Sequence, residues 1–145
     1  MLTADTVTTL ISDSGVVRYR ISAPSWQIFD QAEPTYWEFT DGIYLEKFNP
    51  ELQVTASLRA DYARYWDHDE RWELIGNVRA LNEEGETFLT QQLNWDQKTE
   101  RVYSDSAITI NRQASVIQGI GFESNQTMTR YTILNPTGYF PIEEE

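Results

Sequence analysis

The segment Trp72–Val78, which reads WELIGNV, contains the pattern that decides the fold. Trp72, Leu74 and Val78 stand at alternate positions, with polar residues or Ile75 between them and Gly76 in the series. A period of two is typical of a strand with one buried face. A glycine inside such a strand marks a bulge, a bend or a close approach by another group. We therefore predict a strand that Gly76 curves or opens to a contact.

The same alternation recurs on both sides of this segment. Asp61–Tyr65 precedes it across a polar turn, which predicts a hairpin, and Trp66-Asp67 at that turn recurs as Trp95-Asp96. A second hairpin combines Phe88–Trp95 with a strand that runs on to Ile110. A third, weaker copy begins near Val116 and ends at Leu134. The repeat is 29 residues long, the distance from Trp66 to Trp95. A repeat of this length predicts stacked antiparallel hairpins that share one apolar face, and the sequence shows no helical stripe.

Composition sets the limits of the functional classes. The chain has 145 residues and a mass of 16.9 kDa, which suits one domain with its own core. Its net charge of -12 argues against binding to a nucleic-acid backbone, since its eleven cationic residues are scattered. The lack of cysteine excludes disulfides, thiolate zinc sites and cysteine nucleophiles. We expect no cofactor.

The two ends of the chain differ in composition from the middle. Residues 1–12 are rich in threonine and are expected to be a flexible lead-in that follows a removed signal or anchor. Residues 13–142 form the predicted domain, and residues 143–145 form an acidic tail. The sequence has no apolar run of about 18 residues, the length that a membrane-spanning helix needs.

Four motifs lie in order along the chain: Gly15–Ala23 (GVVRYRISA), Ala60–Ala63 (ADYA), Glu73–Val78 (ELIGNV) and Gly119–Gln126 (GIGFESNQ). Together they resemble the periplasmic domain of the LptC family, which belongs to the bacterial lipopolysaccharide export bridge. The likeness runs from about Ser12 to Asn135, in the family's order and at its approximate spacing, and the last motif resembles the ending of Bacteroidetes-type members.

The resemblance implies an all-β fold, an open, twisted antiparallel β-jelly-roll with a hydrophobic trough for the acyl chains of lipid A. It implies a periplasmic subunit that receives lipid A from the inner-membrane ABC transporter and passes it to the next bridge protein, which is LptA-like. The family's members are anchored in the inner membrane, and this chain lacks both a membrane helix and a lipidated cysteine. The anchor is therefore expected in an N-terminal segment missing from this chain.

The residues themselves predict where lipid would bind, because strands with small side chains on an apolar face leave room for acyl chains. An ordinary packed core has the same composition, so both interpretations of these positions stay open. The predicted trough residues are Val54, Ala56, Leu58, Ala60, Trp72, Leu74, Val78, Leu93, Trp95, Ile108, Ile110, Ile120 and Phe122.

Strand edges are the second predicted site, because backbone pairing with a partner strand needs exposed N–H and C=O groups. Tyr131–Leu134 carries no charge or proline that would protect an edge, so the last strand is the more exposed candidate. Free edges also allow a homodimer. The predicted edge residues are Tyr19, Ile21, Gly119, Gly121, Tyr131 and Ile133.

Catalysis and metal binding have little support. His68, the single histidine, lies in the polar turn Asp67–Glu70, which we interpret as a solvated hairpin tip. No spacing singles out a catalytic pair among 23 acidic residues. We therefore predict a protein that is not an enzyme. Two alternatives remain: a soluble LptA-like bridge protein, and a carbohydrate-binding β-sandwich that would stack sugars on aromatics such as Trp26, Trp37 and Trp66.

Overall fold

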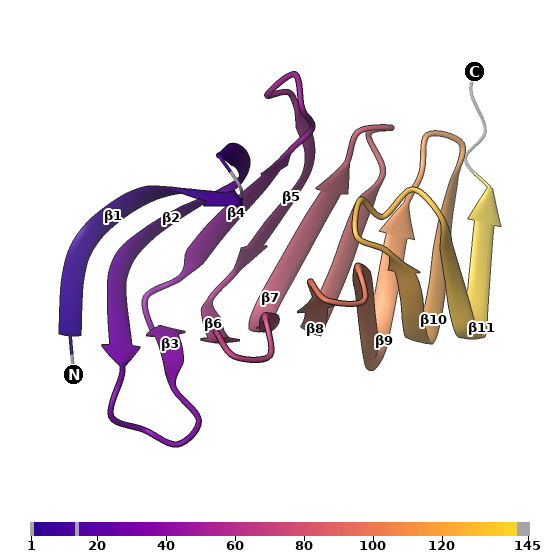
Figure 1. The fold of residues 1–145 in the computed structure, drawn as a ribbon. Helices are drawn as coiled ribbons and strands as arrows, with labels where there is room; N and C mark the ends of the chain where they lie inside the picture. Colours follow the sequence, from indigo (N-terminus) through magenta and orange to yellow (C-terminus); the bar gives the residue numbers. More distant parts are fainter. Residues whose placement is uncertain (1, 14, 142–145) are drawn as a thin grey trace.

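The computed structural model describes residues 2–13 and 15–141, and this part of the chain is built from strands without a helix (Figure 1). The predicted acidic tail, residues 143–145, lies outside the described residues. The eleven strands are β1 Leu2–Asp13, β2 Val16–Phe29, β3 Tyr36–Phe39, β4 Ile43–Phe48, β5 Val54–Ala60, β6 Tyr62–Trp66, β7 Arg71–Asn82, β8 Thr87–Asp96, β9 Arg101–Asn111, β10 Ser115–Asn125 and β11 Tyr131–Pro141.

All eleven strands belong to one antiparallel sheet, which confirms the predicted all-β jelly-roll. In Figure 1 they lie side by side in a curved row, with β1 at one end and β11 at the other. Two positions in the row are shared by pairs of short strands. β2 pairs with β3 near one end and with β4 nearer its middle, and β7 pairs with β6 and then with β5.

The predicted hairpins are confirmed. β6 and β7 pair around the turn at Asp67–Glu70, β8 pairs with β9, and β10 pairs with β11. The polar turn residues end each strand because their side chains compete for backbone hydrogen bonds. Asp96 shows this directly, since its Oδ1 accepts from the backbone N–H groups of Lys98 and Thr99 at 3.0 and 3.2 Å.

A line of bulges crosses the sheet from β7 to β10, and we call it the bulge line. The strand register shifts between Ile75 and Val78 on β7, between Thr90 and Asn94 on β8, and next to Gly121 on β10. Gly76 and Gly121 have φ angles of 85° and 87°, a conformation that favours glycine. Bulges bend strands and increase their twist. Gly76 is therefore a residue that bends the sheet.

Side-chain hydroxyls bond to backbone carbonyls along the bulge line, where the pairing of β8 with β9 is interrupted. Thr90 Oγ1 donates to the carbonyl of Ala107 at 2.7 Å, and Ser104 Oγ donates to the carbonyl of Gln92 at 2.5 Å. Buried backbone groups without partners are costly, so these hydroxyls belong to the bend as much as the glycines do.

The bend lets one face of the sheet close on itself around an aromatic core. Trp72, which is fully buried, lies at its centre and contacts the rings of Tyr19, Phe39, Tyr65 and Trp95 at centroid distances of 4.7 to 6.4 Å. These rings come from five different strands. Aromatic side chains bury large areas, so this cluster contributes much of the hydrophobic stabilisation.

Residues 1–12 were expected to be a flexible lead-in, and the structure describes Leu2–Asp13 as strand β1. It pairs with β2 from Leu2 opposite Ile28 to Asp13 opposite Val16. The β-branched threonine, valine and isoleucine residues that fill this segment favour strand, and the long β2 offers them a free edge. Leu2–Asp13 is therefore part of the sheet.

Candidate functional site

Eleven of the thirteen predicted trough residues lie in the interior of the bent sheet. Each is 3% exposed or less, and all of the eleven except Ala56 belong to one packed hydrophobic cluster. In this structure their own side chains fill the space between the two halves of the sheet. These residues therefore form a packed core in this structure, and their role as a lipid trough stays a prediction.

The other two predicted trough residues face outward. Val54 is 44% exposed at the first position of β5, beyond the end of the interior. Ile120 is 49% exposed because the bulge next to it shifts the alternation on β10, so that Gly119 before the bulge and Phe122 after it face inward. A bulge adds one residue to a strand and so exchanges the two faces beyond it.

The predicted edge residues lie on three strands, of which only β11 is an edge of the described sheet. Tyr131 and Ile133 are on β11, and their half-buried side chains pack against the core. Gly119 and Gly121 are one strand further in, on β10. Tyr19 and Ile21 are on β2, which pairs with both β1 and β4. In the described part of the chain the outer strands are β1 and β11.

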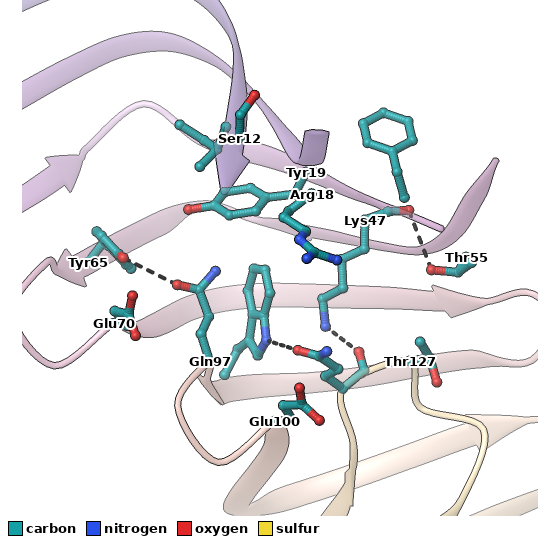
Figure 2. A pocket seen from close by; sticks show the side chains of 14 residues that line it. Ser12, Arg18, Tyr19, Lys47, Thr55, Tyr65, Glu70, Gln97, Glu100 and Thr127 are labelled. Atoms are coloured by element: carbon teal, nitrogen blue, oxygen red, sulfur yellow. Dashed lines mark hydrogen bonds between the residues drawn. The ribbon is translucent and has the colours of Figure 1, made fainter. Parts of the chain in front are cut away.

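A pocket of about 430 Å³ opens at one end of the interior (Figure 2). Its size falls within the range of ligand pockets in proteins. The rings of Tyr19, Tyr65 and Trp95, which belong to the core, also line the pocket. The full lining consists of Ile11, Ser12, Arg18, Tyr19, Lys47, Phe48, Thr55, Tyr65, Glu70, Trp95, Gln97, Glu100, Gln126 and Thr127. The pocket is therefore a polar mouth that leads onto an aromatic interior.

Lys47 is the most unusual residue of the pocket, because it is a lysine that is only 5% exposed. Its Nζ donates to the backbone carbonyl of Gln126 and lies 4.0 Å from the centroid of the Trp95 ring (Figure 2). Burial lowers the pKa of Lys47 to about 7. The sequence did contain a signal for this residue, since Ile43, Leu45 and Lys47 occupy the inward positions of β4.

The loop that joins β10 to β11 closes the interior beside the pocket. The side chain of Asn125 organises the loop, and its Oδ1 accepts from the backbone N–H groups of Thr129 and Arg130 at 3.0 and 3.1 Å. Met128 has a φ of 60° and points its fully buried side chain into the core. Asn82 Nδ2 donates to the Met128 carbonyl at 2.9 Å, which ties the loop to the end of β7.

The carboxylate of Glu86 connects the residues that flank this loop. Glu86 accepts hydrogen bonds from Tyr131 at 2.7 Å and from Asn82 at 2.9 Å, and it forms an ion pair with Arg112 at 2.9 Å. Burial acts to raise the pKa of Glu86, but the hydrogen bonds from Tyr131 and Asn82 and the charge of Arg112 outweigh it and hold this pKa below its ordinary value. Glu86 therefore stays ionised and anchors β11 to the rest of the sheet.

Other candidate residues take structural positions. Trp26 and Trp37 pack against the core and contact each other at a centroid distance of 4.8 Å, while Trp66 lies under the guanidinium of Arg71 at 4.3 Å. His68 is exposed in its turn. Among the side chains that the structure describes, no three His, Asp or Glu residues are grouped so that they could hold a metal ion.

Comparison with known proteins places the chain in a family. Throughout the described ranges, the structure has no helix long and apolar enough to span a membrane. No curated protein matches the sequence. The family model described as lipopolysaccharide-assembly, LptC-related, matches residues 1–139, in agreement with the four motifs. The chain thus belongs to the LptC-related family and takes part in lipopolysaccharide transport.

Proposed function

We propose that the domain is a periplasmic, lipopolysaccharide-binding component of the export bridge, anchored to the inner membrane through a segment that precedes this sequence. It receives lipid A from the transporter and passes it to an LptA-like protein. The observation that carries the proposal is an apolar interior, closed by a bent sheet, that meets a pocket at the sheet's end. Family membership supports the same role.

The energetics of the interior suit acyl chains. Each buried methylene contributes about 0.8 kcal/mol, so ten methylenes would provide roughly 8 kcal/mol before the costs of ordering and of displacing side chains. The interior residues that would make room are small or flexible: Ala56, Ala60 and Met128. The polar mouth around Lys47 and Gln97 suits the headgroup end of an amphiphile.

The two outer strands are the proposed contacts with the bridge. A free strand edge binds another strand through backbone hydrogen bonds and needs no special side chains. β1 would pair with the membrane subunits of the transporter, and β11 with the next protein. In β11, Thr132 and Leu134 are exposed, and Tyr131–Leu134 contains neither proline nor a charged residue that would discourage pairing.

Photo-crosslinking with a benzoylphenylalanine residue tests the lipid site. We would place the probe at Phe48, in the pocket, at Phe88, in the interior, and at Ile75, which is 39% exposed on the outer face. We expect lipopolysaccharide to be captured at Phe48 and Phe88 and not at Ile75. Equal capture at all three positions, or capture at Ile75 alone, would contradict the proposal.

A competitor distinguishes the lipid from its sugar. Deacylated lipopolysaccharide keeps the carbohydrate and loses the acyl chains, so we expect it to leave the crosslink at Phe88 unchanged. If the deacylated molecule abolishes capture at Phe48 and Phe88 at the same concentration as the intact one, the domain recognises carbohydrate instead.

A further inference from the structure

The outer face of the sheet carries two arginines at directly opposite positions of neighbouring strands. Arg59 on β5 and Arg79 on β7 are cross-strand partners, and both are exposed. The Cβ atoms of directly opposite residues in an antiparallel pair lie about 4.5–5.5 Å apart, and like charges at such positions are destabilising. The fold therefore places two arginines at opposite positions of one surface, where both line the same groove.

Neither arginine has a carboxylate partner in the described part of the chain. Four other arginines do, in the pairs Arg20–Glu46, Arg64–Glu38, Arg101–Glu123 and Arg112–Glu86. The chain has 23 acidic and 11 basic residues, so carboxylates are in excess. The guanidinium of Arg59 lies instead over the Tyr44 ring, at 5.0 Å from its centroid.

The acidic side chain that follows Arg59 in the chain, Asp61, has a different partner. Asp61 follows Arg59 by two residues, and its Oδ2 accepts from Asn77 Nδ2 at 2.7 Å. That contact belongs to the bulge line, which holds Asp61 against β7. The two guanidinium groups thus keep their hydrogen-bond donors available.

A shallow groove of about 220 Å³ lies between these residues. Each polar side chain on its wall can donate a hydrogen bond, since these are the two guanidinium groups and the hydroxyls of Ser57 and Tyr44, and no carboxylate lines it. The complete lining is Tyr44, Ser57, Arg59, Arg79, Ala80 and Leu81. Such a wall suits a small anion that has several acceptor oxygens and more than one negative charge.

We propose that Arg59 and Arg79 form a phosphate-binding site on the outer face of the sheet. Arginine binds phosphate through paired N–H donors, and two guanidinium groups that line one groove match its several oxygens. The neighbouring Leu81 and Leu89 are 42% and 40% exposed, so apolar surface adjoins the site. The phosphate belongs either to a lipid headgroup or to a soluble molecule. The site faces away from the interior, because Leu58 and Ala60 on either side of Arg59 are buried.

Titration of the whole domain with pyrophosphate tests the site, with backbone and arginine side-chain NMR signals as the readout. We expect shifts in β5 and β7 around Arg59 and Arg79, and at least ten-fold weaker binding in Arg59→Gln and in Arg79→Gln. Arg130→Gln is the matched control, since Arg130 is exposed and the change in charge is the same. Equal weakening in all three variants, or none in the first two, would overturn the proposal.

Two further measurements identify the source of the phosphate. Co-sedimentation with phosphatidylglycerol vesicles, but not with phosphatidylcholine vesicles, that is lost in Arg79→Gln supports a lipid headgroup. Pyrophosphate binding without vesicle binding supports a soluble phosphate, and the absence of both would refute the site. Lipopolysaccharide capture at Phe48 should be unchanged in Arg79→Gln, so failure here is separable from failure of the proposed transport role.

Discussion

Lys47 shows how one residue links the pocket to the stability of the domain. It occupies an inward position on β4, and the other two inward positions of this strand hold the apolar residues Ile43 and Leu45. A charge at such a position is costly unless it is paired. The Gln126 carbonyl and the Trp95 ring provide partial compensation, and the same contacts fasten the loop between β10 and β11. Lys47 is thus a pocket residue that also holds the β10–β11 loop in place.

The pH dependence of stability should report this burial. The pKa of Lys47 is about 7 in the folded protein, against an ordinary value of 10.5. Between these values the unfolded chain binds the proton that the folded chain has released, so the free energy of unfolding rises with pH. The slope from this residue is at most about 1.4 kcal/mol per pH unit. Below about pH 7 the contribution is flat.

Urea unfolding at pH 6, 8 and 10 measures this effect in the wild type and in Lys47→Met. We expect the free energy of unfolding of Lys47→Met, relative to that of the wild type, to be highest at pH 6 and to fall by pH 10. Lys98→Met is the control, because Lys98 is exposed. A stability difference between Lys47→Met and the wild type that is constant from pH 6 to pH 10 would contradict the assignment.

At the scale of single elements, β11 depends on a close approach to β10 at Gly119. A Cβ atom added at Gly119 would lie 2.2 Å from Ile133 Cγ2 and 2.9 Å from the carbonyl oxygen of Asn135. The second of these contacts is with backbone, which cannot rotate away. β11 can therefore approach β10 this closely at position 119 only because the residue there is glycine.

Gly119→Ala should loosen β11 while the remainder of the sheet stays folded. We expect faster amide hydrogen exchange in Tyr131–Asn135 and little change in β7 and β8. Gln118→Ala is a suitable control, since Gln118 is the preceding residue of β10 and its side chain is exposed. Unaltered exchange in β11 would show that the strands do not approach each other so closely.

The loop between β10 and β11 is the element that holds the end of the interior closed. Met128→Ala removes a fully buried side chain from the core, so we expect the free energy of unfolding to fall by about 2–4 kcal/mol. Thr127→Ala, in the same loop but only half-buried, should change stability by less than about 1 kcal/mol. Chemical denaturation of both variants makes the comparison. Equal losses would show that Met128 does not serve as a core residue.

At the scale of the whole molecule, the sequence predicted the hairpins well and the long-range pairings not at all. Alternation defines a strand locally, so the sequence correctly predicts the turn at Asp67–Glu70 and the strand that contains Trp72. A bulge exchanges the two faces of a strand without leaving a distinct mark, so Ile120 was assigned to the wrong face.

The candidate sites show the same division between local and distant information. Lys47 had a local signal, since it continues the inward series of Ile43 and Leu45, although its partner Gln126 is far away in the chain. Arg59 and Arg79 meet because β5 pairs with β7 past the intervening β6 hairpin. That register depends on how the whole sheet bends, and no short stretch of sequence encodes it.

The two outer strands have a consequence for assembly. β1 and β11 differ in sequence, so pairing of β11 from one molecule with β1 of the next is a head-to-tail contact that does not close by symmetry. Light scattering at rising protein concentration should therefore show a broad, growing distribution of sizes, and Leu134→Pro in β11 should suppress it. A single sharp dimer would instead indicate a two-fold contact. In this arrangement each molecule would be one unit of an open-ended polymer, and a protein that occupied the free edge of β1 or β11 would end the polymer there.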